Sequence, residues 1–129
     1  MNRVIHFELQ ADNIERAKTF YQTVLGWKFE QMMTKAKDGL DYWGITTADD
    51  GPGINGGLYS RTDGEDKYYL FDCTIQVTNI DKSIANIKAN GGQITKEKSK
   101  IPHVGFFANA KDPEGNRFGI MQATEWQPK

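Results

Sequence analysis

The sequence predicts an α+β protein made of two repeated halves, each with the order strand, helix, strand, strand, strand. Two matches indicate the repeat. Asn-Ile-Glu-Arg-Ala at 13–17 aligns with Asn-Ile-Asp-Lys-Ser at 79–83. Near the end of each half, Gly-Leu-Tyr at 57–59 can be laid over Gly-Ile-Met at 119–121. A third observation is that apolar and polar residues alternate on both sides of each predicted helix, which indicates strands there.

The first half begins with a strand and a helix. Residues 4–10 alternate between apolar and polar side chains, which is typical of a half-buried strand. Asn13 is a favourable helix N-cap, and Gly26 is a favourable left-handed end. Between them, apolar residues recur at helical spacing, which predicts a helix whose apolar face packs on the sheet. That face consists of Ala17, Phe20, Tyr21, Val24 and Leu25.

Three short strands complete the first half, and the second half repeats the order. The first-half strands are expected at 27–33, 42–47 and 56–60, separated by turn-forming residues. In the second half, strands are expected at 70–78, 93–96, 104–110 and 117–122, and a helix begins at Asn79. The connector is expected at 63–67. Because neither half can close a core alone, we expect one domain over 1–129, with module one at about 3–62 and module two at about 68–123.

Composition and charge exclude several classes of function. The 129 residues include 16 Lys and Arg against 17 Asp and Glu, which argues against a nucleic-acid-binding protein. No run of about 18 apolar residues is present, so no membrane span is expected. The single cysteine, Cys73, cannot form an intramolecular disulfide, which fits a reducing compartment. We therefore expect a cytoplasmic protein with neither nucleic acid nor membrane as a partner.

Strand alternation also assigns polar side chains to the sheet face opposite the helices. Polar groups among aromatic residues on a concave face are typical of a small-molecule site, and exposed sheet surface is the alternative. Aromatic rings such as those of Trp43 and Tyr59 could stack on a flat or apolar ligand. The candidate ligand-binding residues are His6, Glu8, Trp43, Asn55, Tyr59, Asp72, Thr74, Gln76, Arg117 and Met121. Alternation directs Gln10, Gly57 and Gly119 to the same face.

Several segments resemble the vicinal oxygen chelate superfamily, which includes glyoxalase I, extradiol dioxygenases and bleomycin resistance proteins. They are Val-Ile-His-Phe-Glu-Leu at 4–9, the stretch 17–27 with its Phe-Tyr and Leu-Gly-Trp, and Asp-Pro-Glu-Gly-Asn at 112–116. Gly-Ile-Asn-Gly-Gly at 53–57 and Phe-Gly-Ile-Met-Gln at 118–122 are similar to a branch related to lactoylglutathione lyase. The resemblance implies that two tandem βαβββ modules form a curved mixed sheet that encloses a central pocket. It also implies a homodimer.

The metal enzymes of this superfamily place ligands at four pocket-facing positions, on the first and last strands of each half. The resemblance carries these positions over to His6, Asp72, Gly57 and Gly119. Only His6 is the usual residue type, and the glycines offer no side chain. Because catalytic zinc sites need about three protein ligands, we expect no cofactor. If a divalent metal such as Zn, Ni or Fe binds, its ligands would be His6, Glu8 and Asp72.

Three functions remain open. The preferred one is a protein that binds a small molecule in the cup between its modules, as bleomycin resistance proteins do, without the usual metal site. The second is a lyase or isomerase related to glyoxalase I, in which His6 and Glu8 are the catalytic acid–base groups or hold a reduced metal site. The third is a regulatory or interaction module with a vestigial pocket.

Overall fold

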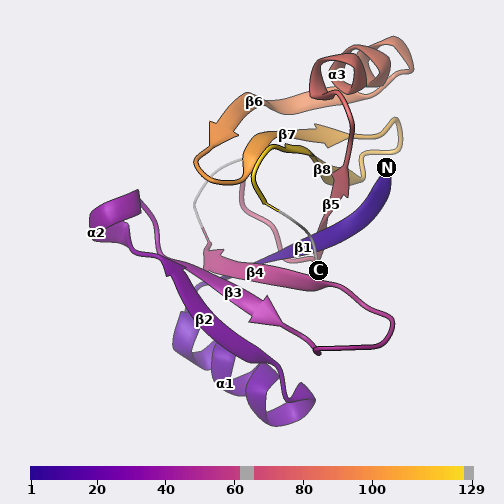
Figure 1. Cartoon of the computed structure of the whole chain (residues 1–129). Coiled ribbons are helices and arrows are strands. Elements are labelled where there is room, and N and C mark those ends of the chain that lie inside the picture. Colours follow the sequence, from indigo (N-terminus) through magenta and orange to yellow (C-terminus); the bar gives the residue numbers. More distant parts are fainter. Residues whose placement is uncertain (62–65, 127–129) are drawn as a thin grey trace. The chain divides into compact units, whose positions relative to one another are not determined.

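The computed structural model describes residues 1–61 and 66–126, and its contacts divide the chain into two units (Figure 1). The first unit is His6–Phe71. The second unit combines Met1–Ile5 with Asp72–Lys129, so the opening residues of the chain belong with its second half.

Both halves have the predicted strand order. The strands are β1 (Arg3–Ala11), β2 (Lys28–Met33), β3 (Tyr42–Thr46) and β4 (Asn55–Ser60), followed by β5 (Asp72–Gln76), β6 (Gln93–Ile101), β7 (Gly105–Lys111) and β8 (Arg117–Ala123). Hydrogen bonds join the strands in the order β2-β3-β4-β1 in the first unit and β5-β8-β7-β6 in the second, which gives each unit its sheet. The pairing is mixed, because β1 pairs with β4 and β5 with β8 in parallel, whereas β3 pairs with β2 and β4 in the antiparallel direction. The predicted α+β class, with two tandem βαβββ modules in a mixed sheet, is confirmed.

The internal repeat extends to the pairing of individual residues. In the first unit, Glu8 on the first strand is the register partner of Gly57 on the last. In the second unit, Thr74 on the first strand is the register partner of Gly119 on the last. The alignment of 57–59 with 119–121 therefore describes equivalent positions in the two halves.

The two main helices begin in the predicted way. Helix α1 (Ile14–Leu25) is capped by Asn13, and α3 (Ile80–Ala89) is capped by Asn79. Each asparagine Oδ1 accepts a hydrogen bond from the N–H three residues later, at 3.0 and 3.1 Å. Gly26 ends α1 with a φ of 71°, a left-handed conformation that glycine adopts without strain. Among the described residues, no helix has the length and apolar character that crossing a membrane requires.

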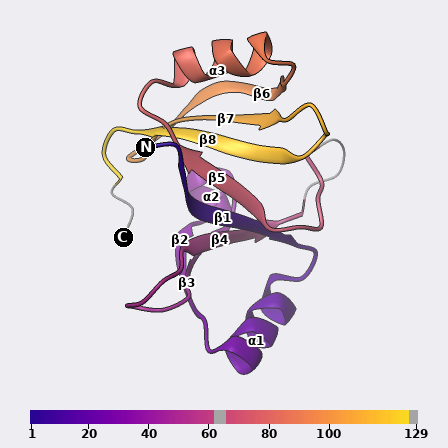
Figure 2. The ribbon, with the colours of Figure 1, turned by 90° about the vertical axis from the view of Figure 1, so that its right-hand side faces the viewer.

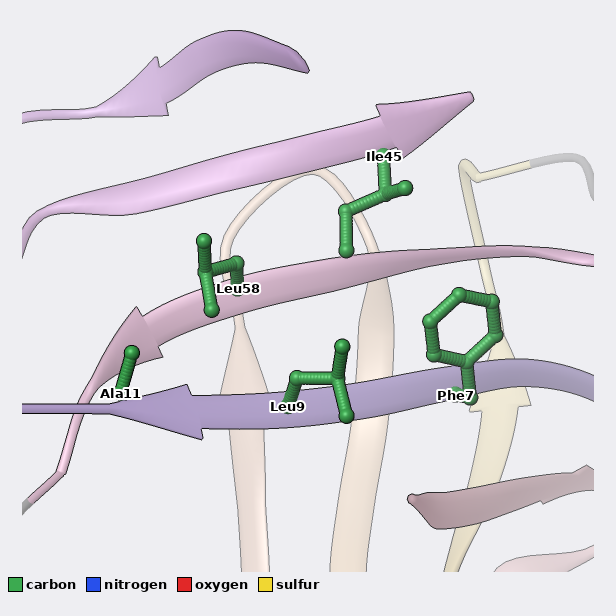
Figure 3. Close-up of a cluster of buried hydrophobic side chains, with 5 residues drawn as sticks. All are labelled: Phe7, Leu9, Ala11, Ile45 and Leu58. Atoms are coloured by element: carbon green, nitrogen blue, oxygen red, sulfur yellow. The ribbon is translucent and has the colours of Figure 1, made fainter. Parts of the chain in front are cut away.

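The first unit has a core between β1, β3, β4 and α1. Its buried side chains are Phe7, Leu9, Ala11, Ile45 and Leu58 (Figure 3). Ala17 and Tyr21 of α1 pack against them. Since alternate residues of a strand point to opposite faces, burial of Phe7 and Leu9 on this side directs His6 and Glu8 to the other side.

The second unit has its own core, formed where α3 lies alongside β6 and packs toward β7 and β8 (Figure 2). Its buried members are Val77, Ile80, Ala108 and Ile120, of which Ile80 and Ala108 are 0% exposed. Phe118 is partly buried against them, as the alternation of β8 predicts.

The outer part of α1 differs from the prediction. Phe20, Val24 and Leu25 were expected on the packed face, but they are 56%, 58% and 52% exposed. Ala17 and Tyr21 do contact the core. The physical reason is that these two residues lie one turn apart and form a narrow stripe, whereas the five predicted positions cover a wider arc than one sheet face contacts.

Smaller differences concern element boundaries. A short helix, α2 (Lys35–Asp38), lies in the segment expected to be a loop, and the Thr34 hydroxyl caps it. Strand β6 is longer than predicted and β5 is shorter. Of the predicted connector at 63–67, residues 63–65 lie outside the described residues.

We predict that Asn13→Ala and Asn79→Ala each lower the free energy of unfolding by about 1 kcal/mol, because each removes the acceptor for an otherwise unbonded helix N–H. Urea denaturation followed by circular dichroism measures this. Asn86→Ala, on the exposed middle of α3, is the control and should cause no loss, since alanine favours helix more than asparagine does. A cap variant as stable as this control would contradict the prediction.

Candidate functional site

Three polar side chains of the first unit meet on the sheet face opposite its core. His6 and Glu8 come from β1, and Tyr42 opens β3. The His6 Nε2 atom lies 2.8 Å from Glu8 Oε1 and 3.1 Å from the Tyr42 hydroxyl oxygen. Tyr42 also donates its hydroxyl hydrogen to Glu8 Oε1 over 2.9 Å. Each member of the group is therefore within hydrogen-bonding distance of the other two.

The group is mostly shielded from water. The side chains of His6 and Glu8 are 17% and 19% exposed. Glu8 Oε2 is buried, and it has no hydrogen-bond partner among residues 1–61 and 66–126. Burial raises the pKa of Tyr42 well above its ordinary value, and the negative charge of Glu8 raises it further. Tyr42 is thus held as a neutral hydroxyl that can donate a hydrogen bond.

Gly57 leaves the space in which this group fits. A Cβ atom at Gly57 would overlap the Tyr42 hydroxyl and ring end, and it would lie 2.7 Å from Glu8 Oε2. Gly57 is also the register partner of Glu8. A glycine is therefore required at this position for the observed contacts of Tyr42 and Glu8.

The equivalent positions in the second unit carry different chemistry. Asp72, whose side chain is 6% exposed, forms an ion pair with Arg117 over 3.0 Å. Thr74, equivalent to Glu8, is 2% exposed. The ring of Phe107 covers Gly119, where an added Cβ would lie 2.6 Å from Phe107 Cζ. The second unit thus has an ion-paired carboxylate and an apolar ring where the first has His6 and Tyr42.

The residues present do not fit the metal site that the resemblance implies. Tyr42 fills the space beside Gly57, Phe107 fills the space beside Gly119, and Arg117 binds one carboxylate oxygen of Asp72, Oδ2. Within the described part of the chain, no three His, Cys, Asp or Glu side chains are grouped so that they could hold a metal ion.

Gln10 and Tyr59 belong to a neighbouring network. The Gln10 amide donates to the Tyr59 hydroxyl over 3.2 Å, and its oxygen accepts from the Tyr68 N–H over 3.1 Å. The ring of Tyr59 is stacked beside that of Tyr42, with centroids 6.3 Å apart. Tyr59 therefore extends the face that carries His6, while Gln10 fixes the segment around Tyr68.

Asn55 lies beside His6, but its side chain forms hydrogen bonds that stabilise the fold. It is the register partner of His6. Its Oδ1 accepts from the Thr47 N–H over 2.9 Å and from the Thr47 hydroxyl over 3.1 Å. These bonds join the start of β4 to the end of β3.

Trp43 does not lie on the predicted face. It packs against the core of the first unit, and the Lys18 ammonium lies 3.5 Å from its ring centroid. Alternation along β3 explains this placement, because Trp43 and the buried Ile45 share one face and Tyr42 takes the other. Tyr42 is the functional candidate that the sequence prediction missed. The sequence signal for this placement was the alternation with Ile45, which puts Trp43 on the apolar face of the strand and Tyr42 on the opposite face.

The remaining candidates lie together in the second unit. Gln76 is the register partner of Met121, which is 5% exposed. The structure thus divides the predicted residues into two sets, one in each unit. His6, Glu8, Gln10, Trp43, Asn55, Gly57 and Tyr59 belong to the first, and Asp72, Thr74, Gln76, Arg117, Gly119 and Met121 to the second.

A cavity of about 390 Å³ in the first unit lies elsewhere. It is lined by the start of α1, including Asn13 and Arg16, and by Leu58 and Arg61. His6, Glu8 and Tyr42 are not part of its lining, so this cavity is separate from the polar group.

Comparisons with known proteins agree with the fold. Residues 3–120 match the family model described as Glyoxalase/Bleomycin resistance protein/Dioxygenase superfamily. The chain belongs to this superfamily. It is 29% identical over 120 residues to proteins named "Putative glyoxylase CFP32" from Mycobacterium bovis and Mycobacterium tuberculosis. The matched region is 93% of this chain and 44% of those proteins, so the chain spans less than half the length of these relatives.

Solved structures with the same fold are similar over nearly the whole chain. A hypothetical protein from Bacillus halodurans C-125 has a TM-score of 0.71 and 15% identity, with 98% of each chain covered. Methylmalonyl-CoA epimerase from Mycobacterium tuberculosis has a TM-score of 0.67 and 11% identity, covering 94% of this chain and 87% of the epimerase. At these identities the likeness concerns the fold alone.

We predict that stability depends on Tyr42 at high pH. The folded state raises the pKa of Tyr42 above the unfolded value of about 10, so the folded state holds the proton more tightly. The contribution is fully present below about pH 10 and is lost as the pH rises through the folded-state pKa. Urea denaturation at increasing pH should therefore show a fall in unfolding free energy that Tyr42→Phe reduces.

Tyr69→Phe is the matched control, because Tyr69 is 73% exposed. It should retain the fall that the unsubstituted protein shows. An equal fall in Tyr42→Phe and in the unsubstituted protein would contradict the assignment of this pH dependence to Tyr42.

Proposed function

We propose that the chain binds a small molecule on the first-unit face that carries His6, Glu8 and Tyr42, without the metal site of the superfamily's metal enzymes. The observation that carries this proposal is the convergence of a histidine, a carboxylate and a hydroxyl, with His6 Nε2 within 3.1 Å of both partners. Groups fixed by one another in this way lose little conformational entropy when they bind a ligand.

The surroundings of the group support binding. His6 and Glu8 retain 17% and 19% side-chain exposure, so each is reachable at an edge. The stacked rings of Tyr42 and Tyr59 add apolar surface next to these polar groups. A few polar groups set among aromatic side chains are typical of small-molecule sites. A ligand with both a polar and an apolar part fits this combination.

A second candidate is metal-free lyase or isomerase activity, and the Glu8–His6 contact favours it. A carboxylate 2.8 Å from one ring nitrogen orients the imidazole, as a general base requires. In such a reaction, His6 accepts the proton of the hydroxyl-bearing carbon next to a carbonyl, and the electron pair of that C–H bond forms an enediolate. Return of the proton to the former carbonyl carbon, with transfer of the hydroxyl proton to the other oxygen, gives the hydroxy-thioester product. The glyoxylase name of the curated relatives adds support for this chemistry.

We predict that the hemithioacetal of methylglyoxal and glutathione binds to the chain after dialysis against EDTA. Isothermal titration calorimetry measures the affinity, and absorbance of the thioester product measures turnover. His6→Ala and Glu8→Gln should each weaken binding by about tenfold or more, the loss typical of a hydrogen bond to a charged group. His103→Ala is the control, because His103 has 89% side-chain exposure and lies outside this group.

The outcomes separate the candidate functions. Turnover that disappears in His6→Ala supports the lyase or isomerase, whereas binding without turnover supports sequestration. If neither the hemithioacetal nor bleomycin binds in a manner that depends on His6 and Glu8, the small-molecule proposal is wrong. The regulatory or interaction module would then be the better description.

A further inference from the structure

The two halves share an arrangement in which an aromatic ring covers a glycine of the last strand. Tyr42 is the register partner of Tyr59, and Phe107 is the register partner of Met121. Each ring leans toward the glycine two residues earlier, which is Gly57 in the first unit and Gly119 in the second. Because the contact occurs at equivalent positions, it is a feature of the repeat. The chemistry around the ring in one half can therefore be compared with that in the other.

The halves differ in the polar groups attached to this shared arrangement. Tyr42 carries a hydroxyl beside Glu8, whereas Phe107 has none and approaches Gly119 next to Thr74. A carboxylate and a phenol can hold or transfer a proton, but a phenyl ring cannot. Phe107 and Thr74 therefore stand in the second half at the places that Tyr42 and Glu8 occupy in the first.

The hydrogen bonds of the first half determine which nitrogen of His6 carries the proton. A carboxylate only accepts hydrogen bonds, so His6 Nε2, at 2.8 Å from Glu8 Oε1, must be the donor. Tyr42 gives its own hydrogen to Glu8, which leaves its oxygen as a second acceptor 3.1 Å from Nε2. The neutral imidazole is therefore protonated on Nε2, with its lone pair on Nδ1.

Gly57 controls both acceptors of that N–H. A side chain on residue 57 would displace the Tyr42 hydroxyl and would crowd Glu8, whose Oε2 is 2.7 Å from the position of the added Cβ. Moving either group removes an acceptor from His6 Nε2. The glycine thus acts on the histidine without touching it.

We propose that Gly57 and Tyr42 are positioning residues that hold His6 in its Nε2-protonated form. The proposal rests on the proposed function and deepens it, because a fixed tautomer keeps the donor and acceptor nitrogens of the binding-site histidine constant. The tautomer of His6 is a property of the free protein, so the proposal can be tested without a ligand.

The test uses nitrogen-15 NMR of the full chain labelled at histidine. The chain has two histidines, so the spectrum contains His6 and an internal reference, His103. Spectra recorded over a range of pH identify the neutral ring, whose two nitrogen shifts report the tautomer. We expect His6 to show a protonated Nε2 in the unsubstituted protein. In Gly57→Ala, its two nitrogen shifts should move toward those of an exchanging mixture of tautomers.

Three further variants identify the cause. Gly119→Ala produces the same kind of clash in the second unit, against Phe107, and should leave His6 unchanged. Tyr42→Ala removes the ring that a methyl group at position 57 would meet, so adding Gly57→Ala to it should cause little further change. If Gly57→Ala acted through a general loss of structure, it would change the His6 shifts in the Tyr42→Ala background as well. Tyr42→Phe keeps the ring and removes only the hydroxyl, and it should weaken the Nε2-protonated signature.

The outcomes are decisive in either direction. The proposal is overturned if Gly57→Ala keeps the original His6 shifts, or if Gly119→Ala changes them equally. If circular dichroism shows that Gly57→Ala does not fold, Tyr42→Phe decides alone, and unchanged His6 shifts in that variant overturn the proposal. Loss of ligand binding with an intact tautomer would contradict the proposed function and leave this inference standing.

Discussion

The parallel pairing of β1 with β4 is the constraint on which the site depends. Its register places Glu8 beside Gly57, and β3, which pairs with β4 on the other side, then brings Tyr42 across the glycine. The same pairing buries Phe7 and Leu9 on the opposite face of β1, which fixes the direction of His6. A shift of one residue would exchange the two faces, so core and site are set by one set of backbone hydrogen bonds.

The sequence predicted those features that depend on residues close together in the chain, namely the two faces of β1 and the starts of α1 and α3. Alternation over 4–10 identified both faces of β1, and the asparagines at 13 and 79 marked the starts of α1 and α3 through bonds to nearby N–H groups. The role of Tyr42 was missed because it depends on a glycine of the neighbouring strand β4, which only the strand register brings close. Trp43 was assigned to the wrong face because the strand was predicted without deciding which of its residues were buried.

Repetition of the fold does not entail repetition of its chemistry. Both halves keep a glycine where the last strand pairs with the first and cover it with a ring, Tyr42 in one and Phe107 in the other. The first half surrounds its ring with ionisable groups, whereas the second pairs Asp72 with Arg117 over 3.0 Å. Both glycines stand where the resemblance would place metal ligands, so the steric role of each ring also explains why a ligand side chain is absent there.

Metal analysis of the full chain, purified without chelator, tests the central claim most directly, namely that the His6 group takes the place of a metal site. Inductively coupled plasma mass spectrometry measures bound Zn, Ni and Fe, and histidine NMR reports whether added metal reaches His6. The account predicts less metal than one equivalent per chain and unchanged His6 signals. One equivalent of metal that is lost in His6→Ala would contradict it.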